Sequence, residues 1–184
     1  MAEPVFKKSG VYQDFNLREL FGVVPDAETR AAFGQAVIDY IKERASKGVG
    51  YGGTPFKASK YSDEYASSLE FQAHGKDKND VNMELTGDML GFMDIVKQTT
   101  QTVRIGWADE KENLKAFNHN TGDTVPKRNF FGLSKKELKE VAAPFMEKLP
   151  ERVRESRANG GPDDFTTRAL SFLDRLEGND SDGE

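Results

Sequence analysis

The chain has 184 residues, of which 36% are hydrophobic and 31% are charged, and its formal net charge is −5. This length suits one compact domain with extensions, or two very small domains. The absence of cysteine excludes disulfides, cysteine metal sites and thiol nucleophiles. The acidic balance argues mildly against a dedicated nucleic-acid binder. No transmembrane helix or secretory signal is expected, because no apolar run is long enough.

The first 25 residues are too apolar for a free tail, so we expect them to dock on the core or on a neighbouring subunit. A helix is predicted from about Glu28 to Ser46, with Asp26 as its N-cap and Gly48 as its stop. One face of that helix is apolar at helical spacing: Phe33, Val37, Tyr40 and Ile41.

In the middle of the chain we predict a loop over 48–62 and a short helix over Asp63–Ala73. A turn over His74–Asp80 and one helical turn over Asp88–Phe92 follow. The stretch from Ile95 to Trp107 predicts the best strand. Its second half alternates, with Val103, Ile105 and Trp107 on one face.

The region after that strand predicts a short helix over Glu110–Asn118, a loop over Asn120–Gly122 and an extended edge segment over Val125–Phe131. A second helix begins at Ser134, where the spacing Ser134-x-x-Glu137 is a capping box. Pro144 lies inside its apolar stripe, so we expect a kink or a restart of the helix there.

The last part of the chain begins at the linker Gly160-Gly161-Pro162. Phe165 and Phe172 lie on a short amphipathic stripe, which needs a surface to pack on because an isolated helix of that length is marginal. We therefore predict three parts: an N-terminal extension (1–25), an α+β domain (26–158), and a linker with a short helix and acidic tail (159–184). The domain should contain a small antiparallel sheet packed with the N-terminal helix and the long C-terminal helix.

Catalytic and cofactor patterns are weak throughout. Gly48, Gly50 and Gly53 have the spacing of a dinucleotide loop, but they follow a helix rather than a strand. His74 and His119 lack a second ligand at metal-site spacing, and no G-x-S-x-G elbow is present. We therefore predict no catalytic, cofactor-binding or metal-binding residue and no enzyme. A hydrolase that uses His119 and nearby acids is the least supported alternative.

Basic and aromatic residues lie together in one short stretch, where Lys127 and Arg128 precede Phe130 and Phe131. Such interleaving can bind single-stranded nucleic acid, but aromatic residues and arginine are also enriched in protein interfaces. The acidic chain as a whole favours an interface. Strand alternation would turn one of the two phenylalanines inward and the other outward.

Four segments occur in an order that is typical of one family. They are Leu85-Thr86-Gly87-Asp88-Met89-Leu90, the strand end Val103-Arg104-Ile105-Gly106, His119-x-x-Gly122, and Pro126-Lys127-Arg128-Asn129-Phe130-Phe131-Gly132-Leu133-Ser134 before a capped helix. With these segments the chain resembles the tail-completion, or virion-morphogenesis, proteins of tailed bacteriophages over about residues 28–150. Lys127 and Asn129 stand where that family has a small residue and a second proline.

This resemblance implies a structural protein of the head–tail junction, located at the neck of the virion and assembled in the host cytoplasm. It implies a homo-oligomeric ring, with a hexamer favoured, around a lumen through which DNA passes without specific binding. Its partners would be tail-terminator, head-closure or connector, and tail-tube or sheath proteins, with no membrane contact. The expected assembly residues are Lys127, Arg128, Phe130, Phe131, Phe165 and Phe172. The alternative is a small nucleic-acid-associated factor that uses the basic and aromatic stretch.

Overall fold

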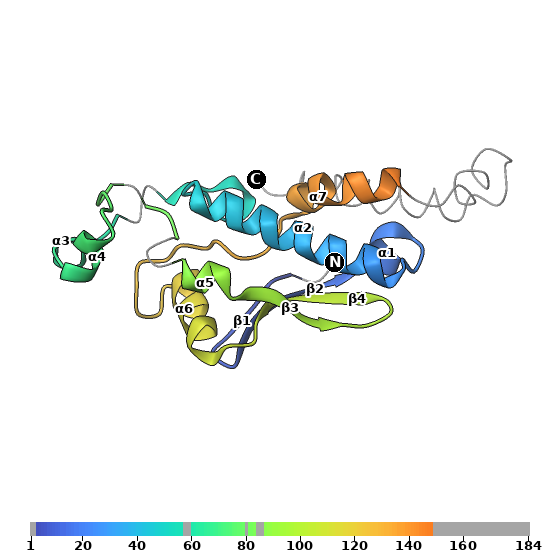
Figure 1. Ribbon diagram of the computed structural model, residues 1–184, viewed down its shortest axis with the longest axis horizontal. Coiled ribbons are helices and arrows are strands. Elements are labelled where there is room, and N and C mark those ends of the chain that lie inside the picture. Colours follow the sequence, from blue (N-terminus) through green and yellow to red (C-terminus); the bar gives the residue numbers. More distant parts are fainter. Residues whose placement is uncertain (1–2, 57–59, 80, 84–86, 149–184) are drawn as a thin grey trace, which may run out of the picture.

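The computed structural model describes residues 3–56, 60–79, 81–83 and 87–148, and these form an α+β fold, as predicted (Figure 1). One antiparallel sheet has the strand order β1-β2-β4-β3. The strands are β1 (Val5–Lys7), β2 (Gly10–Asn16), β3 (Met93–Gln98) and β4 (Thr102–Trp107). No helix in the described part of the chain has the length and apolar character needed to cross a bilayer.

The N-terminal residues form an integral part of this sheet. β2 lies between β1 and β4, where Gln13 pairs with Ile105 and Phe15 pairs with Val103. The inward positions of β2 are fully buried, while the alternate positions are partly exposed. The predicted boundary after residue 25 therefore does not separate two structural units. The N-terminal residues pack on the core of their own chain, which is one of the two surfaces predicted for them.

The predicted strand from Ile95 to Trp107 was wrong in one respect, because it is two strands. β3 and β4 form a hairpin, in which the backbone N–H of Thr99 donates to the carbonyl oxygen of Thr102 (2.9 Å). The Thr99 hydroxyl also accepts the N–H of Thr102 at 3.0 Å. These threonines close the turn without glycine, proline or asparagine, so the usual turn signal is absent.

One face of the sheet is covered by α2 (Ala27–Ser46), with α1 (Leu17–Phe21) and α7 (Lys135–Glu147) beside it (Figure 1). Asp26 caps α2 as predicted, because its carboxylate accepts the N–H of Thr29 at 2.7 Å. Gly34 allows close packing here, since a Cβ at this position would lie 2.5 Å from the Ile95 side chain. The core is continuous between the sheet and these helices.

Helix α7 begins at the predicted capping box, in which the Ser134 hydroxyl accepts the Glu137 N–H and the Glu137 carboxylate accepts the Ser134 N–H. The predicted restart at Pro144 was wrong, because the helix continues to Glu147. Pro144 is exposed, so water can satisfy the carbonyl group that lacks its helical donor.

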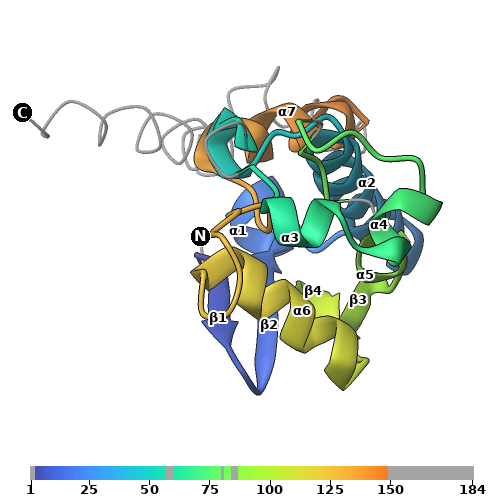
Figure 2. The ribbon, with the colours of Figure 1, turned by 90° about the vertical axis from the view of Figure 1, so that its left-hand side faces the viewer.

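Short elements complete the fold: η1 (Tyr51–Gly53), α3 (Asp63–Ala66), α4 (Leu69–Ala73), α5 (Asp88–Gly91) and α6 (Glu110–Thr121). The helix predicted over 63–73 is divided, since Ser62 and Ser68 each accept a backbone N–H as separate N-caps. α6 packs against β1, β2 and β4 (Figure 2). It extends past Asn118 to Thr121, so Asn120 lies on a helix rather than in the predicted loop, and His119 lies on the same helix.

Candidate functional site

The segment between α6 and α7 runs from Gly122 to Leu133 and is not the predicted edge strand. Val125–Phe131 forms no strand ladder. Its backbone bonds instead to the helix and loop around it: the Arg128 N–H donates to the His119 carbonyl at 2.7 Å, and the Asn129 carbonyl accepts the Tyr51 N–H at 2.8 Å. The segment is therefore held from several directions by distant parts of the chain.

Two buried amide side chains replace the missing ladder. The Asn120 carbonyl oxygen accepts the backbone N–H groups of both Phe130 and Phe131, each at 3.0 Å. The Gln13 carbonyl oxygen accepts the N–H of Leu133 at 2.9 Å. Buried backbone donors need such partners, because an unsatisfied N–H costs about 1–3 kcal/mol.

Arg44, on α2, binds the other side of the same segment. Its guanidinium donates to the carbonyl oxygens of Phe130 (2.5 Å) and Gly132 (2.9 Å) and forms an ion pair with Glu137. Burial raises the pKa of the Glu137 carboxyl, but hydrogen bonds from Ser134 and Arg44 outweigh burial and leave that pKa below its usual value. Arg44 and Glu137 are both buried, so this pair joins α2 to α7 through the segment.

The prediction that one phenylalanine faces outward was wrong. Phe130 and Phe131 are both 0% exposed and pack on Trp107, with ring centroids 6.0 and 5.0 Å away. Without strand alternation both rings can point into the core. Gly132 has a φ of 96°, and a Cβ there would lie 2.3 Å from the Pro4 ring. This half of the segment therefore builds the fold and leaves neither ring for a partner to contact.

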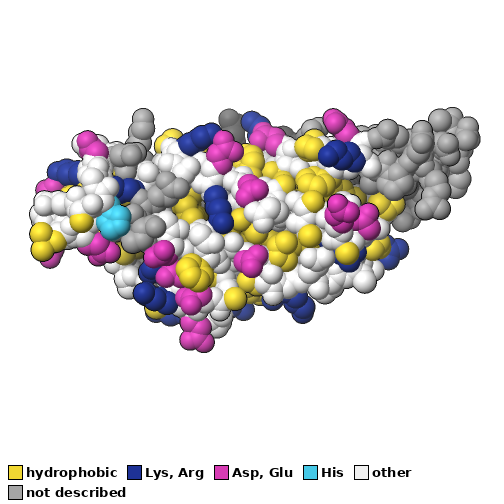
Figure 3. All heavy atoms as spheres, viewed as in Figure 1, with side chains coloured by type: hydrophobic (Ala, Val, Ile, Leu, Met, Phe, Trp, Pro, Cys, Tyr) yellow, Lys and Arg dark blue, Asp and Glu magenta, His cyan; other side chains and the backbone are white. Residues whose placement is uncertain are grey.

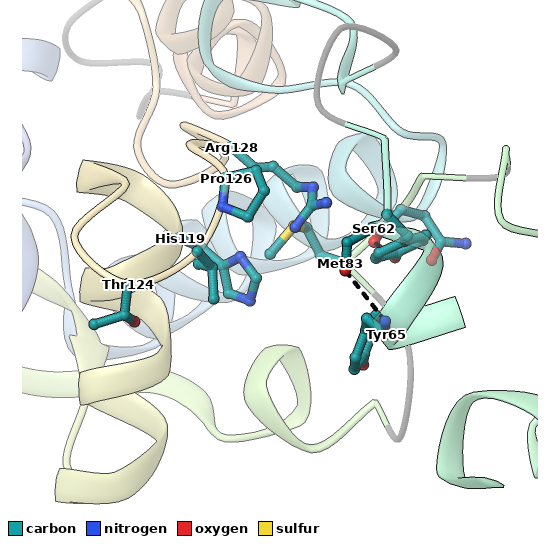
Figure 4. Close-up of a pocket in the computed structure, with 10 residues that line it drawn as sticks. Ser62, Tyr65, Met83, His119, Thr124, Pro126 and Arg128 are labelled. Carbon is teal, nitrogen blue, oxygen red and sulfur yellow. Dashed lines mark hydrogen bonds between the residues drawn. The ribbon is translucent and has the colours of Figure 1, made fainter. Parts of the chain in front are cut away.

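The other half of the segment lines a cavity of about 360 Å³ between α6 and the residues around α3 (Figure 4). Its lining residues are Tyr61, Ser62, Tyr65, Asn82, Met83, His119, Thr124, Val125, Pro126 and Arg128. A volume of this size is in the lower part of the range for small-ligand pockets.

Arg128 is 4% exposed, so it belongs to the cavity wall rather than to the outer surface, contrary to what an assembly contact requires. Its guanidinium lies 4.8 Å from the centroid of the Tyr61 ring. Burial lowers the pKa of Arg128, yet a guanidinium remains charged at neutral pH. Lys127 beside it is exposed, and Phe165 and Phe172 lie outside the described residues.

His119 projects from α6 into the same cavity (Figure 4). Burial, and then the charge of Arg128, lower its pKa to about 4. Its Nδ1 is buried and has no hydrogen-bond partner among the described residues. A neutral imidazole with so low a pKa is a poor general base near pH 7.

Metal binding has no geometric support within the described ranges, since no group of three or more His, Cys, Asp or Glu residues is placed to hold an ion. Comparisons of the chain with protein-family models, with curated proteins and with solved structures gave no match.

Several residues of this site were missed in the sequence. Gln13 had a signal, because it lies between Val11 and Phe15 in the alternation of a buried strand. Arg44 also had one, since it continues the apolar face of α2, but a basic residue near a helix C-terminus has an ordinary explanation in the helix dipole. Asn120 had no signal in the sequence, because its partners Phe130 and Phe131 reach it only through the path that residues 122–133 take.

Proposed function

We propose that this protein is a structural subunit of the head–tail junction of a tailed bacteriophage, of the tail-completion class. The proposal rests on the ordered segments that the chain shares with that family. One observation adds weight: His119–Ser134, the most distinctive of them, runs through the centre of a single α+β domain. Its residues tie α2, α6, α7 and β2 together, which gives a folding reason for the pattern.

Partner contacts in this proposal lie on exposed apolar side chains rather than on Phe130 and Phe131. Leu69, on α4, is 86% exposed, and Phe92, which follows α5, is 56% exposed. Hydrophobic side chains are visible at the end of the molecule that α3 and α4 form (Figure 3). Single exposed apolar residues are common on monomers, so exposure alone does not mark a contact surface. Leu69 and Phe92 are proposed because they are large and lie at two separate places on the surface. A ring in which each subunit presents one such surface to the next would need two different contact faces.

The virion location, the ring and the passage of DNA through its lumen belong to the same proposal. The net charge of −5 supports a lumen that does not hold DNA, because like charge discourages binding. Tail-terminator, head-closure and tail-tube proteins are the partners it names.

The test is assembly. The full chain is co-expressed with the tail-terminator and head-closure proteins encoded beside it, and the products are analysed by light scattering and electron microscopy. We expect a ring or a joint complex, and virions without this protein should show unjoined heads and tails. Leu69→Lys should weaken assembly, while Gln72→Lys, an exposed change on the same helix, should not. A monomer that joins neither partner, together with normal virions in its absence, would contradict the proposal.

The alternative, a nucleic-acid-associated factor, has lost most of its binding surface. Arg128, Phe130 and Phe131 are buried, so bases cannot stack on them as the sequence suggested. Exposed lysines remain at Lys127 and Lys136. Salt-dependent binding to single-stranded DNA that disappears in Lys127→Glu/Lys136→Glu would favour this alternative.

A further inference from the structure

The cavity brings together the side chains of two residues from the distinctive segment, His119 and Arg128. Phe130 and Phe131 are accounted for by the core, and Gly132 by its close approach to Pro4. His119 and Arg128, nine residues apart in sequence, instead face the same cavity from α6 and from the segment after it (Figure 4). A buried cation at the wall of a cavity points to recognition of a ligand.

The lining has the chemistry of an anion site. It contains Arg128 as its cation and, among its ten residues, no aspartate or glutamate. His119 stays neutral at pH 7 and adds hydrogen-bonding capacity without charge. The Lys76 ammonium donates to the side-chain oxygen of Asn82, a lining residue, so a second cation is bonded to the cavity wall.

The chemistry of Arg128 favours oxyanions that can accept two parallel hydrogen bonds. Its guanidinium lies over the Tyr61 ring, 4.8 Å from the ring centroid, and this contact helps to hold the arginine side chain at the cavity wall. A guanidinium offers five donors in a fork that matches a carboxylate or a phosphate, so contacts within the chain and a bound oxyanion can coexist. The Ser62 hydroxyl, which accepts the Tyr65 N–H at 3.1 Å, can still donate its proton to a ligand.

We propose that this cavity binds an oxyanion, either a carboxylate presented by another polypeptide or a free phosphate, with Arg128 as the principal donor. The inference goes beyond the head–tail function and does not depend on it, because it uses only the residues that line the cavity.

The experiment is calorimetric titration of the full chain at constant ionic strength with two probes. One is inorganic phosphate, and the other is a capped peptide with the acidic sequence of residues 177–184. Saturable binding of either probe is expected. Tighter binding of the peptide assigns the site to a polypeptide carboxylate, and tighter binding of phosphate assigns it to a free anion. Failure of both probes to bind at about 10 mM overturns the proposal.

A matched pair of variants locates the binding. Ser62 and Ser68 are the N-caps of α3 and α4, and aspartate is an equally good cap, so both Ser→Asp changes should fold. Only Ser62 lines the cavity, so Ser62→Asp places a carboxylate in the cavity and should weaken binding at least about tenfold. Ser68→Asp should leave affinity unchanged. Equal weakening in both variants contradicts the proposal.

Arg128→Gln should remove binding, and its circular dichroism shows whether the fold survives the loss of a buried charge. Lys127→Gln is its neighbouring control, because Lys127 is exposed and does not line the cavity. If Arg128→Gln unfolds, the comparison of Ser62→Asp with Ser68→Asp still tests whether the oxyanion binds in the cavity. Binding that persists undiminished in a folded Arg128→Gln protein would overturn the proposal.

Discussion

Among the residues that the structure describes, two arginines are almost fully buried, at 8% and 4% exposure, and they differ in what surrounds them. Arg44 lies in closed packing, where Glu137 and the carbonyl groups of Phe130 and Gly132 accept its hydrogen bonds. Arg128 lies at the wall of a cavity, with its guanidinium 4.8 Å from the centroid of the Tyr61 ring. Burial alone therefore does not distinguish a folding role from a binding role, whereas the space beside the charged group does.

The largest effect should follow from opening the closed packing at Arg44. Arg44→Met leaves the Glu137 carboxylate buried without its cation, so we expect unfolding to cost about 3–5 kcal/mol less, measured by urea titration. Lys47→Met is the matched control. Its ion pair with Glu43 is exposed, so a change below about 1 kcal/mol is expected. Similar losses of unfolding free energy in both variants would show that the buried Arg44–Glu137 pair stabilises the fold no more than an exposed ion pair does.

Asn120 tests the same closed packing from the side of α6. Asn120→Ala leaves the backbone N–H groups of Phe130 and Phe131 buried without acceptors, and a loss of about 3 kcal/mol is expected in urea unfolding. Asn118→Ala on the same helix should be close to neutral, because the side-chain oxygen of Asn118 is buried without a hydrogen bond. An equal loss in the two variants would mean that the hydrogen bonds of Asn120 to Phe130 and Phe131 are not the cause of the destabilisation.

His119 tests the cavity side through pH. Its folded pKa of about 4 lies below the ordinary value near 6.5, so the unfolded chain binds its proton first as pH falls. The neutral His119 therefore leaves the unfolding free energy unaffected above about pH 6.5. As pH falls towards 4 the unfolding free energy decreases, and the decrease is about 2 kcal/mol by pH 5. His119→Gln should show a flatter decline between about pH 7 and pH 5 in urea unfolding. Parallel curves would place His119 in contact with water.

Lys127 should give the smallest effect. It is exposed next to the buried Arg128, so Lys127→Gln should change the unfolding free energy by less than about 0.5 kcal/mol. A larger loss in thermal or urea unfolding would mean that the boundary between the outer surface and the cavity wall lies one residue earlier.

The sequence predicted those features whose cause is local. The Asp26 cap and the Ser134–Glu137 capping box depend on residues three positions apart, and both are present. The fold class followed from the same periodic patterns. β2 was missed although Val11, Gln13 and Phe15 alternate, because a polar residue stands at the central inward position.

Features set by distant residues could not be read in this way. The extended segment before α7 looked like an edge strand, but its hydrogen bonds come from side chains at Gln13, Arg44 and Asn120. Its two phenylalanines share the core because no ladder imposes alternation. The cavity depends on the approach of residues near Tyr61 to α6, which leaves no periodic trace in either segment.

The bond between Gln13 and Leu133 also bears on how the chain folds. It joins residues 120 positions apart, and β2 pairs along its length with β4, about ninety positions later. During synthesis the first strand must therefore wait for most of the domain before it can form its hydrogen bonds. We expect slow folding for a chain of this size, and a domain that cannot form from either half alone.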